Sequence, residues 1–279
     1  MTHILAATDL SPRADRAVER AFQLAAAHGA ALTVLTVLDD AMPERLAKVM
    51  MPETRGHLTA FCDSLSDGGR IGYEAKVLQG DPSHLIPETA RVLQADLIAL
   101  GLHRRRPFMD TLRETTLERT VRLAAAPVLL VRNHPEGDYA RILAAVDFSP
   151  ASAAAIRVAH RLAPGATIRG VHAVQIPLVS YSPNDPRSEA AAGFVRDAED
   201  ASARWMDLTA LPPTLTKPEI RAGALSTVLG SELAALRPDL LALGAHARLG
   251  IAHRMLGSFA LELVRDPPTD LLIATPGTD

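Results

Sequence analysis

Short apolar runs alternate along the chain with segments in which apolar residues recur every three to four positions. The first run covers residues 4–8 and ends at Asp9, and Ser11 and Pro12 then supply an N-cap and a first-turn proline for a helix that stops at Gly29. Further strands are expected at 32–38, 71–78, 96–100 and 128–131, and further helices at 42–65, 83–93 and 112–124. This alternation predicts an α/β fold in which helices cover both faces of a parallel sheet.

The pattern occurs twice. The segment 3–12 returns as 141–150 at an offset of 138 residues, and the segment 95–105 returns as 238–248 at an offset of 143 residues. A repeat of this length predicts two copies of one domain. The copies join in the polar, turn-rich stretch 132–138, so we expect domains at 1–134 and 138–279.

Right-handed crossovers would wind each copy into an open, doubly wound sheet. Ligands of such sheets bind beyond the carboxyl ends of the strands. Asp9 and Asp147 follow the first strand of each copy at that end, and their carboxylates can accept hydrogen bonds from a sugar hydroxyl or a base amine. The alternative is that the aspartate and the following serine only cap the first helix.

The charge, the hydropathy and the cysteine content of the chain argue against several classes of partner and location. The 29 basic and 32 acidic side chains nearly balance, so we expect neither nucleic acid nor an anionic membrane as a partner. No apolar run approaches the length of a membrane span, and the single cysteine, Cys62, cannot form an internal disulfide. These features predict a cytoplasmic protein.

The connection after the fourth strand of the second copy is rich in small residues. Gly244 is expected to let the chain turn, Ala247 to let the backbone approach a ligand, and Gly257 and Ser258 to open the next helix. Free N–H groups and the dipole at such a helix start bind anions, with the Ser258 hydroxyl as a further donor. We interpret this loop as a phosphate cradle.

The first copy carries the same loop with different side chains. Gly101 and Thr115 match Gly244 and Ser258, but Arg104 replaces Ala247 and Glu114 replaces Gly257. A carboxylate near a phosphate is unfavourable, because two unit charges about 4 Å apart repel by about 4 kcal/mol at an effective dielectric of about 20. We therefore expect the first copy to bind no nucleotide.

The sequence gives little support for a metal site or for catalytic residues. His103 and His246 occupy matching positions, but no second ligand recurs at helical spacing in both copies, so we expect no metal site. No general base or nucleophile recurs in both loops, and no residue is assigned a catalytic role. Trp205 and Phe194 are interpreted as core or helix-face residues.

The two copies resemble the universal stress protein family in its tandem form. The resemblance rests on Thr8-Asp9-Leu10-Ser11 and Val146-Asp147-Phe148-Ser149, on the glycine and histidine after each fourth strand, and on Gly257-Ser258. It implies a five-stranded parallel sheet in each copy, in the order 3-2-1-4-5, and a pseudo-dimer within one chain. The fifth strands, 128–131 and 271–274, would pair, and Asp270, which replaces the family's proline, would make that pairing less regular.

The resemblance also implies ATP as ligand, with or without Mg²⁺. Asp147 and the backbone of Ala173 would meet the adenine, and Gly244, Ala247, Gly257 and Ser258 would meet ribose and phosphates. The matching positions of the first copy are Asp9, Val37, Gly101 and Thr115. These residues predict an ATP-binding stress-response or signalling module that binds mainly in its second copy.

Two other functions stay open: an interaction scaffold that binds no nucleotide because both loops have changed, and a slow ATPase whose turnover rests on positioning alone. A homodimer beyond the pseudo-dimer is also left open.

Overall fold

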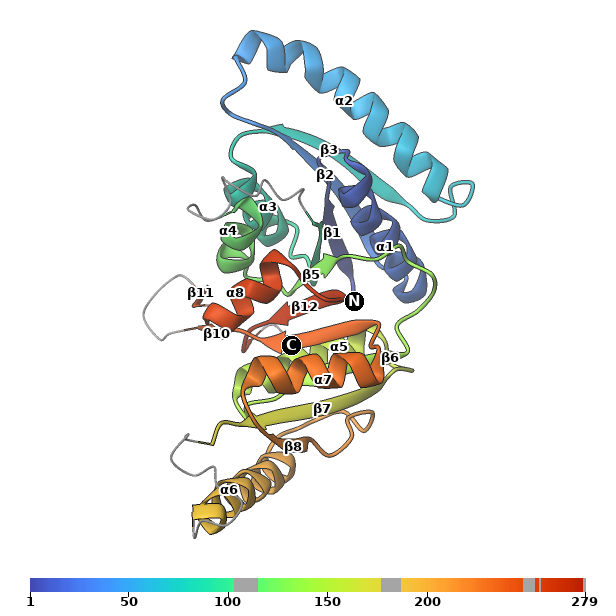
Figure 1. The fold of residues 1–279 in the computed structure, drawn as a ribbon. Helices are drawn as coiled ribbons and strands as arrows, with labels where there is room; N and C mark the ends of the chain where they lie inside the picture. Colours follow the sequence, from blue (N-terminus) through green and yellow to red (C-terminus); the bar gives the residue numbers. More distant parts are fainter. Residues whose placement is uncertain (103–114, 177–186, 248–253, 256, 278–279) are drawn as a thin grey trace. The chain divides into compact units, whose positions relative to one another are not determined.

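The computed structural model describes residues 1–102, 115–176, 187–247, 254–255 and 257–277 (Figure 1). Within this part of the chain, one compact unit joins 1–137 to 247–273, and a second consists of 138–246 and 274–277. The compact units therefore differ from the halves of the sequence repeat, because residues 247–273 of the second half fold into the first unit. The domain limits 1–134 and 138–279 stay a prediction about the repeat.

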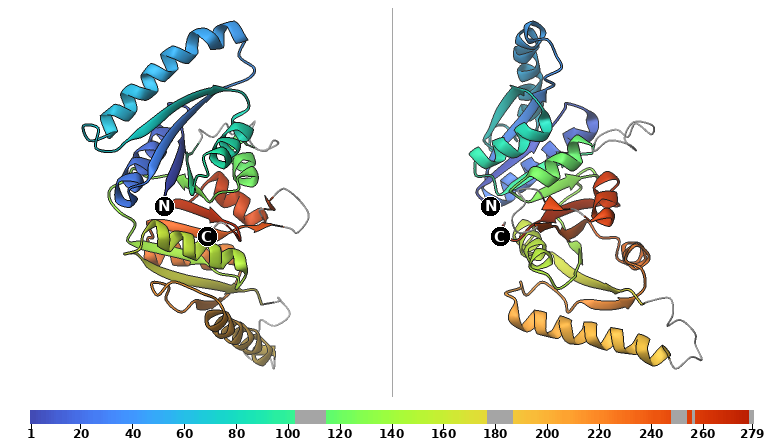
Figure 2. Two further views of the ribbon diagram at one scale, coloured as in Figure 1. Left: turned by 180° about the vertical axis from the view of Figure 1, so that it is seen from behind. Right: turned by 90° about the vertical axis from the view of Figure 1, so that its left-hand side faces the viewer.

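The first unit contains all of the first copy's described strands and helices, in alternation. Its elements in this copy are β1 (His3–Ala7), α1 (Pro12–His28), β2 (Ala31–Leu38), α2 (Glu44–Leu65), β3 (Tyr73–Gln79), α3 (Pro82–Val92), β4 (Leu97–Gly101), α4 (Thr116–Leu123) and β5 (Val128–Val131). The strands lie in the order β3-β2-β1-β4-β5 and all four neighbouring pairs are parallel. Helices α1 and α2 contact each other, as do α3 and α4, on opposite faces of the sheet (Figures 1 and 2).

The second unit repeats this arrangement. Its elements are β6 (Arg141–Ala145), α5 (Pro150–Leu162), β7 (Thr167–Val174), α6 (Arg187–Leu208), β8 (Glu219–Ala222), α7 (Leu225–Leu236) and β9 (Leu240–Gly244). The strands lie in the order β9-β6-β7-β8 and are parallel. The α/β class and the predicted strand order are thus confirmed.

The remaining elements come from the end of the chain. They are the two-residue strands β10 (His246–Ala247) and β11 (Arg254–Met255), the helix α8 (Ser258–Arg265) and the strand β12 (Asp270–Ala274). Strand β12 pairs antiparallel with β5, with Leu272 opposite Leu129, so the predicted pairing of the fifth strands is confirmed. The paired residues of β12 are Leu271, Leu272 and Ile273. Asp270, the first residue of β12, is outside this register, and its carboxylate accepts hydrogen bonds beyond the end of β5, so its expected effect on the regularity of the pairing stays a prediction.

The apolar runs of the sequence form the buried strands. Ile4 and Leu5 of β1, Leu97 of β4, and Leu129 and Leu130 of β5 are fully buried. Burial on both faces explains why these strands are apolar without alternation. The predicted caps are also present, because Ser11 and Ser149 accept hydrogen bonds from the first turns of α1 and α5.

Two predicted elements of the first copy begin two residues late, and several other boundaries differ by one residue. The helix expected at 42–65 begins at Glu44, because Pro43 before it has an extended backbone, and the strand expected at 71–78 runs from Tyr73 to Gln79. Of the helix expected at 112–124, the described part is α4, and residues 112–114 lie outside the described residues.

Candidate functional site

The carboxyl ends of the strands bring several predicted residues to one end of each sheet. Strand β1 ends at Ala7, opposite Leu35, so the last residues of β2 extend beyond it and place Val37 near the level of Asp9. In the second unit, β6 ends at Ala145, opposite Val171, and Ala173 lies beyond that level, as Asp147 does. The structure therefore brings Asp147, Ala173 and Gly244 to the same end of the second unit's sheet.

The first strand-to-helix connection has the same geometry in both copies. Asp9 and Asp147 are exposed, and each carboxylate accepts the backbone N–H of the serine two residues later, at 3.0 Å for Ser11 and 3.1 Å for Ser149. The serine in turn caps the helix. The capping interpretation is thus correct for the serines, and a ligand-binding role of the two aspartates stays a prediction.

The residue after each of these aspartates has a left-handed backbone. Leu10 has φ of 60° and Phe148 has φ of 61°, a conformation that costs a non-glycine residue about 1–2 kcal/mol. No glycine in the sequence marks this turn, so sequence reasoning missed it. Its recurrence at matching positions shows that both copies keep the strain.

In the second unit this turn places an aromatic ring beside the candidate base site. The ring of Phe148 stacks on His172 with centroids 4.4 Å apart, and it lies 5.8 Å from the buried ring of Trp205. Nδ1 of His172 donates to the carbonyl oxygen of Val146 at 2.7 Å, which fixes the proton on that nitrogen. His172 precedes Ala173 on β7, so the cluster borders the residues assigned to the base.

Gly101 and Gly244 have a role in packing. A Cβ atom on Gly244 would lie 2.4 Å from the carbonyl carbon of Ala151 in the first turn of α5, and a Cβ atom on Gly101 would lie 2.3 Å from Cα of Ala14 in α1. Neither glycine has positive φ. The expectation that Gly244 lets the chain turn is therefore wrong: it is glycine because a helix passes too close for a side chain.

Gly257 has no comparable structural requirement. It is the exposed N-cap of α8, with φ of −60°, and among the described residues no atom lies within 4 Å of the position that its Cβ would take. The cap contributes no side-chain hydrogen bond to the first turn of α8. Ala247 is the last residue of β10 and Ser258 the first of α8, both assigned to the first unit with Gly257.

The matching helix of the first copy begins differently. Thr115 caps α4, and Glu118 completes a capping box by accepting the N–H of Thr115 at 2.6 Å. The other oxygen of this buried carboxylate accepts Nε–H of Arg265 at 2.6 Å. A carboxylate thus already occupies the amide end of α4, and the residue of α8 at the same place in the repeat is Leu261. Sequence reasoning missed Glu118, although the Thr-x-x-Glu spacing marks it.

Arg104, Glu114 and His103, which distinguish the first loop in sequence, lie outside the described residues. Within the part of the chain that the structure describes, no group of three or more His, Cys, Asp or Glu side chains is placed to hold a metal ion. Among the same residues, no helix combines the length and apolar character needed to cross a bilayer.

Comparison with known proteins gives one consistent result. The model of the universal stress protein family matches residues 1–132 and again residues 138–275. Universal stress protein A homolog 1 of Coxiella burnetii is 32% identical over 113 residues, covering 36% of this chain and 76% of that protein.

Solved structures resemble the whole chain. A universal stress protein from Archaeoglobus fulgidus has a TM-score of 0.71 at 16% identity, covering 99% of this chain and 98% of that one. A putative universal stress protein from Pseudomonas aeruginosa has a TM-score of 0.65 at 18% identity, covering 99% and 94%. At these identities, the likenesses show the fold.

Proposed function

The chain belongs to the universal stress protein family, with two copies of the family's domain in tandem, and on this premise we propose that it is an ATP-binding stress-response or signalling module. Its second copy, residues 138–275, is the proposed binding half. Asp147 and the backbone of Ala173 would contact the base, and Gly244, Ala247, Gly257 and Ser258 the ribose and phosphates.

The observation that carries the proposal is the difference between the starts of α4 and α8. At α4 the amide of Thr115 is already bound by the carboxylate of Glu118. At α8 the cap is Gly257, which offers no side-chain hydrogen bond, and no atom of a described residue lies within 4 Å of the position that its Cβ would take. Helix starts left with free N–H groups favour anions such as phosphate. This difference supports nucleotide binding by the second copy rather than by the first.

Isothermal titration calorimetry of the full chain with ATP and Mg²⁺ tests the proposal. We expect one nucleotide per chain. Gly257→Glu places a carboxylate at the start of α8 and should weaken binding at least about 100-fold, which corresponds to about 2.7 kcal/mol. The matched variant Thr115→Ala in the first copy should leave the nucleotide affinity unchanged.

Three results would contradict this assignment. No heat and no thermal shift with millimolar nucleotide would favour the scaffold function. Two equivalents per chain would show that the first copy binds as well. Equal affinity of wild type and Gly257→Glu would place the nucleotide elsewhere.

A further inference from the structure

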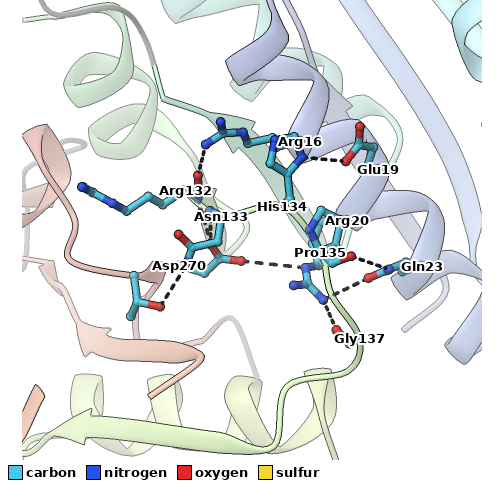
Figure 3. Close-up of polar contacts among 11 residues, drawn as sticks. Arg16, Glu19, Arg20, Gln23, Arg132, Asn133, His134, Pro135, Gly137 and Asp270 are labelled. Atoms are coloured by element: carbon cyan, nitrogen blue, oxygen red, sulfur yellow. Dashed lines mark hydrogen bonds and ion pairs between the residues drawn. The ribbon is translucent and has the colours of Figure 1, made fainter. Parts of the chain in front are cut away.

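A buried carboxylate lies at the start of β12. The side chain of Asp270 is 1% exposed. A charged group in such a position is costly unless it is paired and hydrogen-bonded. One oxygen accepts the backbone N–H groups of Arg132 at 2.9 Å and Asn133 at 3.1 Å, just beyond β5, and the other lies 3.8 Å from Nε of Arg20 (Figure 3).

Arg20 comes from the buried face of α1 and also holds the segment that follows β5. One of its terminal nitrogens donates to the carbonyl oxygen of Gly137 at 2.6 Å and to Oε1 of Gln23 at 3.0 Å. Gln23 donates to the carbonyl oxygen of Pro135 at 3.3 Å. Helix α1 therefore fixes both Asp270 and the segment whose amides bind it.

The apolar residues of the two fifth strands do not by themselves decide which strand pairs with which. Leu129 of β5 lies opposite Leu272 of β12, and the 143-residue offset relates these two residues. Two copies of β12 from two chains could therefore pair in the same register, with Leu272 opposite Leu272. Both strands are short, apolar and buried, so either pairing buries similar side chains.

The groups around Asp270 make the pairing of β12 with β5 differ from the pairing of two β12 strands. In a pairing of two β12 strands, the places of Arg132 and Asn133 are taken by Thr275 and Pro276, and proline has no N–H to donate. The place of Arg20 in the repeat is taken by Val158, at the 138-residue offset. Each Asp270 would lose Arg20 and, of the two amide donors described above, would keep one at most, while staying buried.

We propose that Asp270 selects the partner of β12: together with Arg20 and the amides of Arg132 and Asn133, it makes β12 fit β5 and excludes a second copy of β12. A single buried polar group acts in this way when wrong partners leave it unpaired. The proposal concerns assembly and does not depend on nucleotide binding.

Oxidative disulfide trapping in the full chain tests the proposal. Leu272→Cys puts one new thiol at the position where two β12 strands would meet, since directly opposite residues of an antiparallel pair lie close together. The chain is unfolded, refolded at high concentration and oxidised, and the cross-linked dimer is quantified on a non-reducing gel. All variants carry Cys62→Ala so that only the new thiol reacts.

With Asp270 present we expect little dimer. Asp270→Pro, which copies Pro127 of the first half, should raise the dimer fraction at least tenfold. Asp270→Asn keeps an amide-accepting oxygen without the charge and should give an intermediate value, and it serves as the test if Asp270→Pro does not fold.

Two controls make the result specific. Leu129→Cys reports pairing between two β5 strands, which contain no aspartate at the matching position, and its dimer fraction should not change with Asp270→Pro. Leu129→Cys combined with Leu272→Cys should form a disulfide within one chain. The proposal is wrong if the Leu272→Cys chain forms the same fraction of dimer with Asp270, Asn or Pro at position 270.

Discussion

A Cβ atom on Gly244 would lie 2.4 Å from the carbonyl carbon of Ala151. The same relationship holds between Gly101 and Ala14 in the first copy. We predict that Gly244→Ala and Gly101→Ala each lower the free energy of unfolding by about 1–3 kcal/mol, because the helix must move away from the strand. Urea denaturation without nucleotide measures this effect.

Gly257→Ala is the matched control, because its methyl group meets no described atom within 4 Å. Its cost should stay below about 1 kcal/mol, the scale of an N-cap change. A Gly244→Ala chain as stable as wild type would contradict the packing role and return Gly244 to the ligand site alone.

The capping box of α4 gives a second prediction. Thr115→Ala removes the hydroxyl that accepts the N–H of Glu118 and should cost about 1 kcal/mol of unfolding free energy. Thr116→Ala is the control, because that side chain is exposed and its carbonyl oxygen, which accepts from Thr120, is retained. Equal stabilities of the two variants in urea would show that the cap contributes nothing.

Two aspartates at matching positions of the repeat, Asp96 and Asp239, make the stability of the protein depend on pH. Asp96 accepts the backbone N–H groups of Thr2 and His3, and Asp239 accepts those of Ala140 and Arg141. Burial raises the pKa of both carboxyls, but the hydrogen bonds outweigh it, so both pKa values lie below the ordinary 3.8. Their stabilisation is therefore full above the unfolded pKa and is lost as pH falls through the lower native pKa.

We predict that Asp96→Asn with Asp239→Asn lowers stability at pH 7 and makes the remaining stability fall less steeply between about pH 5 and pH 2. Urea titrations across this range measure both effects. Asp40→Asn, at an exposed position before α2, is the control and should keep the wild-type slope. An unchanged slope in the double variant would show that other carboxyls carry the acid sensitivity.

The single thiol should be inert in the native protein. Cys62 is fully buried in α2, and burial, with a smaller contribution from the charge of Asp63, raises its pKa to about 12. At pH 8 the thiolate, which is the reactive form, is then scarce and inaccessible. Iodoacetamide followed by mass spectrometry should show no label on the native chain and one label in guanidinium chloride. Rapid labelling of the native chain would contradict the burial.

The sequence was sufficient for the elements and their order, because hydrophobic periodicity is a local signal and the repeat shows each motif twice. Ser11 and Pro12 mark the start of α1 correctly, and the apolar run 128–131 is the fifth strand of the first copy. The predicted boundary was wrong where the backbone conformation of a single residue ends or starts an element. Pro43, for example, has a non-helical backbone directly before α2.

The candidate site and the contacts around Asp270 were only partly predictable, because their decisive contacts join residues that are separated in the sequence. Arg20 reads as a polar position on α1, yet it is buried because Asp270, 250 positions later, supplies its partner. The left-handed backbone of Phe148 could not be predicted from the sequence, because no glycine stands there. The contacts of its ring with His172 and Trp205 form only in the folded unit.

During synthesis, β5 is made well before β12, the strand with which it pairs. Leu130 meets Leu271, which the ribosome adds roughly 140 residues later, or about 7 to 28 seconds later at about 5–20 residues per second. Throughout that interval, β5 lacks its antiparallel neighbour, and an uncovered apolar strand is a template for wrong pairing. Slower translation of the second half would lengthen the time for which β5 is uncovered.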